Sequence, residues 1–172
     1  MKRFRLYYDK DAELVWLNDM CRRGWAMESF FLGVYTFAPC QPGEYIYQID
    51  MPEGSGFRPS DPEGYTEFME DIGVEVVQFW GRWVILRKKA AEGPFEFYTD
   101  PASRIAQYRR IRLFFLWTLL LELLGSTGVW RGALDGGAKT AIAVMFLLII
   151  AVFLRAVWRC TKRIQSLEKD SE

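Results

Sequence analysis

Histidine is absent from this 172-residue chain, and with it the commonest general base and the commonest transition-metal ligand of proteins. The chain contains only three cysteines, Cys21, Cys40 and Cys160, and no Cys-x-x-Cys spacing of the kind that marks zinc and redox sites. We therefore expect no metal site, no cofactor and no enzymatic activity. Cysteines so few and so widely separated are typical of a reducing, cytosolic compartment.

A secretory signal and a basic nucleic-acid-binding surface are also missing. The charged start, Met1 to Arg5, is followed by no apolar run, so we expect no cleaved signal peptide. Residues 1–100 carry 11 lysines and arginines against 17 acidic residues, a net charge of −6, whereas residues 101–172 carry 11 against 5, a net charge of +6. Because nucleic-acid binding depends on basic groups that neutralise phosphates, we expect no direct binding by the acidic part.

Apolar residues are concentrated in two runs, Ile111 to Trp130 and Thr140 to Trp158. A helix of about 20 apolar residues crosses the hydrocarbon core of a bilayer, and both runs come close to that length. The sequence therefore predicts a transmembrane hairpin, and a pair of buried core helices is the alternative. The expected segments are a connecting helix that continues into the first span (101–130), a short external turn (131–139), a second span (140–158) and a cytosolic tail (159–172).

Basic residues flank the two runs on the side of both chain ends, whereas the turn between the runs holds only Arg131 and Lys139. By the positive-inside rule this asymmetry predicts a multi-pass protein of the cell membrane with both termini in the cytoplasm. The residues that set this orientation are Arg109, Arg110 and Arg112 before the first run, and Arg155, Arg159, Lys162 and Arg163 after the second.

The junction between the two parts has no flexible linker composition. Asp100-Pro101 is a strong helix start, and no further proline or glycine occurs before Gly125. We therefore expect one unbroken helix that connects the soluble part to the bilayer mechanically. A helix that serves only as a passive foot is the alternative.

Residues 1–100 show the patterns of a small cytosolic domain with strands and helices. Capping residues and helical periodicity predict a helix from Asp9 to Gly24 and another from Asp61 to Gly73. Alternating or β-rich segments predict six strands, at 2–8, 25–32, 34–37, 44–51, 74–80 and 82–88. This order predicts an α+β fold, with an antiparallel sheet that carries both helices on one face, ferredoxin-like or related.

Two groups of side chains are candidates for binding. Aromatic residues of the strands are candidates for the lining of a small-molecule pocket, although core packing explains most of them; they are Trp25, Tyr35, Tyr45, Tyr47, Trp80 and Trp83. Glu122 lies near the middle of the first apolar run, with Thr118 one helical turn before it. An ionised carboxylate there costs about 2.5 to 3.5 kcal/mol, so we expect an intramembrane polar contact or a protonated acid without a role.

Several short motifs of the soluble part resemble an uncharacterised bacterial family, domain-of-unknown-function family 2812 (DUF2812). They are Trp16 to Met20 with Gly24-Trp25, Tyr35 to Phe37, Gly43 to Asp50, and Glu96 to Asp100. The resemblance covers residues 1 to about 112 and departs from the family at Gly73-Val74, where members often carry tryptophan after the glycine. It implies C-terminal membrane helices and a regulatory or envelope-response setting, because several members are encoded near PadR-type transcriptional regulators. It brings no catalytic residues.

Three classes of function remain open. The favoured one is a membrane-anchored cytosolic sensor or regulatory adaptor that binds a protein partner or small effector. The second is an accessory subunit of a transporter or envelope complex, and the third is an enzyme on a membrane-proximal substrate. The expected partners are the membrane itself, a PadR-type regulator or a membrane transporter, and a second copy of the chain.

Overall fold

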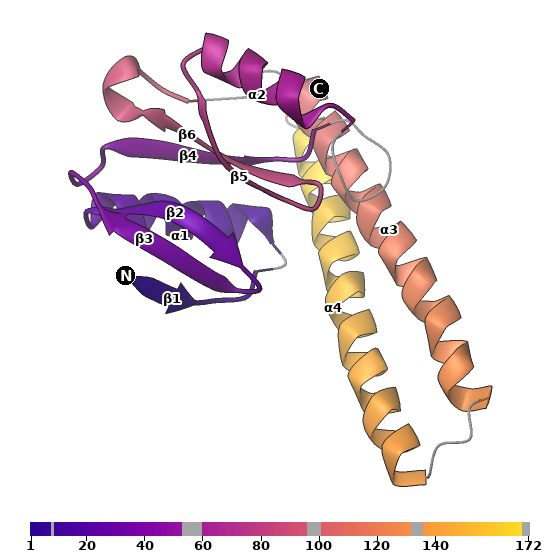
Figure 1. The fold of residues 1–172 in the computed structure, drawn as a ribbon. Coiled ribbons are helices and arrows are strands. Elements are labelled where there is room, and N and C mark those ends of the chain that lie inside the picture. Colours follow the sequence, from indigo (N-terminus) through magenta and orange to yellow (C-terminus); the bar gives the residue numbers. More distant parts are fainter. Residues whose placement is uncertain (8, 53–59, 96–100, 132–135, 170–172) are drawn as a thin grey trace. The chain divides into compact units, whose positions relative to one another are not determined.

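The computed structural model describes residues 1–7, 9–52, 60–95, 101–131 and 136–169. The chain divides into two compact units, Met1–Phe97 and Tyr98–Glu172 (Figure 1). The first unit is built of β1 (Lys2–Phe4), α1 (Lys10–Arg22), β2 (Trp25–Phe31), β3 (Val34–Pro39), β4 (Tyr45–Asp50), α2 (Pro62–Asp71), β5 (Glu75–Trp80), β6 (Trp83–Lys89) and a short 3-10 turn, Ala90–Glu92.

Both helices of the first unit begin where their capping residues predict. The Asp9 carboxylate accepts a hydrogen bond from the Asp11 amide at 3.1 Å, and the Asp61 carboxylate accepts one from the Gly64 amide at 3.0 Å. These bonds satisfy amides of the first helical turn, which have no partner within the helix. After α2 the chain reverses at Gly73, whose φ of +75° suits a residue without a Cβ.

The six strands form two antiparallel sheets of three strands each, in the orders β1-β3-β2 and β4-β6-β5. Each sheet comes from one β-α-β-β segment, so the same topology occurs twice along the chain. The α+β class and the C-terminal helical hairpin predicted from the sequence are confirmed. The single sheet is corrected to two, because β2 and β5 lie side by side without forming a ladder.

The helices also lie on opposite sides of the β4-β6-β5 sheet rather than on one face. One core cluster combines α1 with a face of each sheet, and its buried residues include Leu17, Met27, Tyr35, Phe37, Tyr47, Ile49 and Ile85. The other combines α2 with the opposite face of β4-β6-β5 (Figure 1), through Met69, Val74, Val84, Leu86 and Phe95. The consecutive residues Val84, Ile85 and Leu86 are therefore all buried, which requires cover on both faces of the strand.

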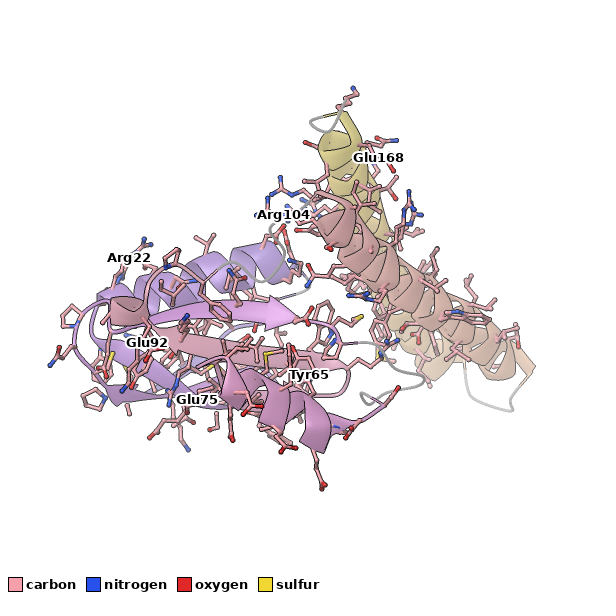
Figure 2. All side chains as sticks on the ribbon, turned by 90° about the horizontal axis from the view of Figure 1, so that it is seen from above. Arg22, Tyr65, Glu75, Glu92, Arg104 and Glu168 are labelled. Atoms are coloured by element: carbon pink, nitrogen blue, oxygen red, sulfur yellow. The ribbon has the colours of Figure 1, made fainter. Side chains whose placement is uncertain are left out.

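A polar contact also joins α2 to this sheet. Tyr65 lies on α2 (Figure 2), and its hydroxyl donates a hydrogen bond to Asp50 Oδ2 on β4 at 3.1 Å. Asp50 is only 2% exposed, and a buried carboxylate needs such partners because burial removes it from water.

The second unit is an antiparallel pair of helices, α3 (Pro101–Arg131) and α4 (Gly136–Lys169). Both are long and apolar enough to cross a membrane. The rings of Phe115 and Phe153 meet between them, with centroids 6.0 Å apart. Their middle parts expose large apolar side chains, for example Trp117 at 58% and Leu147 at 65%, as expected of surfaces that face lipid. Of the predicted external turn, residues 132–135 lie outside the described residues.

Candidate functional site

Side chains, rather than a backbone ladder, join the two sheets of the first unit. Gln78 of β5 bonds the backbone of Phe30 in β2 twice: the Phe30 amide donates to Gln78 Oε1 at 2.6 Å, and Gln78 Nε2 donates to the Phe30 carbonyl at 2.7 Å. Each strand has a register irregularity beside this contact, between Met27 and Ser29 in β2 and between Val76 and Gln78 in β5. The bulges disrupt regular pairing, and the amide side chain of Gln78 takes the place of a paired residue.

Two further side chains complete this join at Met27. The Met27 amide donates to the Tyr47 hydroxyl at 2.8 Å, and Arg87 Nη1 donates to the Met27 carbonyl at 3.2 Å. Arg87 also holds both carboxylate oxygens of Glu75 (labelled in Figure 2), at 2.8 and 2.6 Å, and its guanidinium lies 4.5 Å from the centre of the Tyr45 ring. We call Tyr47, Gln78 and Arg87 the seam, since together they satisfy the amides and carbonyls of Met27 and Phe30.

The seam residues are suited to holding a backbone edge. Burial raises the pKa of Tyr47 to about 12, so its hydroxyl stays neutral at physiological pH. A buried amide or carbonyl without a partner costs about 1 to 3 kcal/mol, and the seam removes that cost at four backbone groups. Neither Gln78 nor Arg87 is among the residues predicted from the sequence. The signal available for Gln78 was one polar residue within the apolar strand Val76 to Trp80.

A second polar feature lies on α1, where Glu13 meets an aromatic cluster. The Tyr35 hydroxyl donates to Glu13 Oε1 at 2.6 Å, and Tyr35 itself is 1% exposed. Trp16 packs edge-on against Tyr35 with ring centroids 4.8 Å apart, and the Arg5 guanidinium lies 5.1 Å from the centre of the Trp16 ring. Burial raises the pKa of Glu13, and the hydrogen bond from Tyr35 offsets part of that rise.

The raised pKa of Glu13 predicts a pH-dependent contribution to stability. A carboxyl that binds its proton more tightly in the folded state stabilises the fold at low pH and loses this contribution as pH rises from the usual value of 4.5 through the folded pKa. We expect Glu13→Gln to remove this part of the pH dependence. Denaturant unfolding of the detergent-solubilised chain, followed by tryptophan fluorescence across this pH range, measures it. Glu28→Gln, at an exposed position, is the control and should leave the dependence of the free energy of unfolding on pH as it is in the unsubstituted chain. If Glu13→Gln also left this dependence unchanged, the assignment to Glu13 would be wrong.

The structure places five of the six predicted aromatic residues in or against the first core. Tyr35 and Tyr47 are buried with bonded hydroxyls, and Trp25, Tyr45 and Trp83 are partly buried against the same cluster. Trp80 lies at the end of β5 and contacts the rings of Phe30 and Phe31. Core packing thus accounts for five of these positions, and a ligand pocket among them stays a prediction.

Two of the cysteines, far apart in the sequence, meet in the structure. The Sγ atoms of Cys21 and Cys40 are 4.0 Å apart, and both residues are free thiols. Burial raises the pKa of the Cys40 thiol to about 11, so it stays protonated and unreactive. Among the residues that the structure describes, no three Asp, Glu or Cys side chains gather as metal ligands would.

Comparison with known proteins identifies a family but no characterised relative. Residues 9–120 match the family model DUF2812, described as a protein of unknown function. The match covers more than half of the chain. The chain belongs to the DUF2812 family. No curated protein and no solved structure matches it.

The DUF2812 match includes the seam and both cores, begins at the residue that caps α1, and ends inside α3. Val74 stands where members of the resembled family often carry tryptophan. It is only 3% exposed in the second core, so this position serves packing in this member of the family. All of α4 lies beyond the match.

The predicted intramembrane residues lie at the end of the DUF2812 match. Thr118 Oγ1 donates to the carbonyl of Phe114 at 2.9 Å within α3. Glu122 makes no hydrogen bond or ion pair with any residue in the described ranges. A contact of Glu122 with a membrane partner therefore stays a prediction.

The basic residues predicted to set the orientation lie at one end of the helix pair. Arg109, Arg110 and Arg112 are near the start of α3, and Arg155 to Arg163 are in the second half of the antiparallel α4. Arg109 Nη2 contacts Glu168 Oε1 at 3.0 Å, which brings the two basic segments to the same end of the hairpin.

Proposed function

We propose that this DUF2812 protein is a membrane-anchored cytosolic sensor or regulatory adaptor. In this proposal the α+β unit binds a protein partner or a small effector, and the hairpin holds it at the inner face of the cell membrane. The observation that carries the proposal is α3, a single helix of 31 residues that runs from Pro101 through the whole first apolar run. A movement of the membrane-spanning part of such a helix also moves its cytosolic part, because no flexible linker interrupts the helix.

The lengths of the helices support this coupling. At about 1.5 Å per residue, α3 is roughly 46 Å long and α4 roughly 51 Å, whereas the hydrocarbon core of a bilayer is about 30 Å thick. Each helix therefore extends well beyond the hydrocarbon. The extensions carry the basic residues and the Arg109–Glu168 ion pair, so they leave the bilayer as a paired helical stalk.

The charges support the proposed orientation. Both basic segments lie at the stalk end of the hairpin, and cytoplasmic loops of membrane proteins are enriched in such residues. Both chain termini are then cytoplasmic, which fits the free thiols of Cys21 and Cys40.

Crosslinking in intact cells, followed by identification of the captured proteins, tests the proposal. Capture of a DNA-binding regulator, of the PadR type or another, is the expected result. Capture of a membrane transporter that persists when the α+β unit is deleted would instead establish an accessory subunit whose hairpin is the binding surface.

A helix-breaking insertion tests the coupling separately. We expect a short Gly-Ser insertion after Tyr108 to leave membrane anchoring intact while abolishing regulation of the captured partner, because it interrupts the stalk. The same insertion after Lys169, at the end of α4, is the control. Normal regulation by the Tyr108 insertion variant would show that α3 is only a passive foot.

A further inference from the structure

One face of the β1-β3-β2 sheet exposes a row of apolar side chains. Phe4 pairs with Val34 across β1 and β3, and Val34 pairs with Phe31 across β3 and β2. Directly paired residues point to the same face, and neighbours along a strand point to opposite faces. The row therefore lies on the face opposite Tyr35, whose side chain belongs to the first core, and Phe4, Val34 and Phe31 are 67%, 37% and 65% exposed.

Two leucines extend this row at the β2–β3 turn. Leu6 is 73% exposed and Leu32 is 63% exposed. Leu6 and Phe4 lie over Gly33: a Cβ on this glycine would be 2.7 Å from Leu6 Cδ2 and 2.9 Å from Phe4 Cε2. We call Phe4, Leu6, Phe31, Leu32 and Val34 the apolar tip.

The backbone of Leu32 in the apolar tip adopts a conformation that is unfavourable for leucine. Leu32 has a φ of +44°, the left-handed region, which costs a residue with a Cβ about 1 to 2 kcal/mol. Asparagine or glycine would relieve this strain at an ordinary turn. A large apolar side chain that is both exposed and on a strained backbone does not stabilise the fold. Such a residue indicates a surface that binds a partner or a membrane.

Basic residues near the apolar tip lie on both faces of the sheet: Lys2 shares the face of Phe4, whereas Arg3 pairs with Tyr35 and Arg5 lies over Trp16 on the opposite face. Lys2, Arg3 and Arg5 are exposed, and residues 1–8 contain no acidic residue, although residues 1–100 carry a net charge of −6. Neither Lys2 nor Arg3 forms an ion pair with another residue of the described ranges. Trp80, a residue type enriched at membrane–water interfaces, contacts the ring of Phe31 at the rim, with centroids 5.6 Å apart.

We propose that the apolar tip inserts into the headgroup region of an anionic membrane leaflet, with Lys2 contacting lipid phosphates. This inference rests on the proposed membrane anchoring, since the hairpin keeps the α+β unit close to the bilayer and raises the effective concentration of lipid at the tip. Exposed apolar side chains flanked by Lys and Arg are the features that bind proteins to anionic interfaces.

The charge of Lys2 disfavours the main competing occupant, a second copy of the chain. A two-fold contact through the apolar tip would bring Lys2 of both copies into one interface. Like charges brought together in this way oppose association, whereas an anionic leaflet attracts Lys2.

Hydrogen exchange of the full-length chain in nanodiscs tests the inference. We compare discs of phosphatidylcholine alone with discs that also contain phosphatidylglycerol, and we follow the amides of residues 30–34. The expected result is exchange several-fold slower in the anionic discs, with the difference reduced at high salt. The α2–β5 turn at Gly73 is the internal control and should exchange equally in both discs.

Two double variants test whether the protection depends on the apolar tip. Phe31→Ser with Leu32→Ser removes two exposed apolar side chains and should abolish the protection. Phe68→Ser with Ile72→Ser, at exposed apolar positions on α2, is the matched control and should retain it.

The outcomes separate this inference from the anchoring on which it rests. Equal exchange in both kinds of disc, with the chain still inserted, overturns the lipid contact alone. Protection that appears in detergent without lipid and rises with protein concentration assigns the apolar tip to a second copy and also overturns it. Release of the chain from the discs by an alkaline wash removes the anchoring and the inference together.

Discussion

Replacement of Gln78 by leucine is expected to destabilise the first unit by about 2 kcal/mol. Leucine has a similar volume but no polar group, so the amide and the carbonyl of Phe30 lose their partners at once. A buried backbone group left without a hydrogen bond costs about 1 to 3 kcal/mol, and we take the lower end of this range for each group because both hydrogen bonds are only partly buried. Denaturant unfolding of the detergent-solubilised chain measures the change, and hydrogen exchange should locate it at β2.

The control for this prediction is Gln41→Leu, the same chemical change at an exposed position of the same unit. We expect it to stay within about 0.5 kcal/mol of the unsubstituted chain, as surface substitutions usually do. If Gln78→Leu were equally harmless, the seam would not be what joins the two sheets.

Two arginines in the middle of α4 are expected to prevent the second span from inserting. Leu147→Arg with Leu148→Arg raises the free energy of membrane insertion by about 3 to 4 kcal/mol at each position. Both side chains are exposed and lie in the uninterrupted apolar stretch, so no buried contact is lost. A tag at the C-terminus should then become accessible from outside the cell, as labelling or protease digestion of intact cells will show.

The matched control carries the same two charges on the same helix, as Gln165→Arg with Ser166→Arg. Both positions are exposed and lie beyond the apolar run, so the tag should remain cytoplasmic. Recovery of the folded, unsubstituted chain in the aqueous fraction after cell breakage, without detergent, would contradict membrane anchoring itself.

Local patterns were sufficient to predict most elements of the fold. Asp9 and Asp61 marked the starts of α1 and α2, because capping is a contact between residues two or three positions apart. The apolar runs marked α3 and α4 for a similar reason, since hydropathy over a window of about 20 residues is a property of the segment alone.

The candidate sites were harder to predict, because their geometry depends on residues distant in the sequence. Gln78 meets Phe30 across 48 positions, and Arg87 meets Met27 across 60. Neither pair shares a motif or a spacing. Five of the six aromatic residues named as candidates for a pocket lie in or against the first core. Residue type alone does not distinguish a ring in a core from a ring around a ligand.

Short motifs carried the resemblance to the family. The amino-acid sequence was also enough to establish the α+β class, the apolar hairpin and the split of charge between the two parts. These follow from composition and from short-range periodicity, which any stretch of chain carries within itself. The division of the strands into two sheets, the side-chain seam and the exposure of the apolar tip came from the folded chain. Each depends on which strand edges meet and which faces are covered, and a bulge of one residue in β2 or β5 is enough to change both.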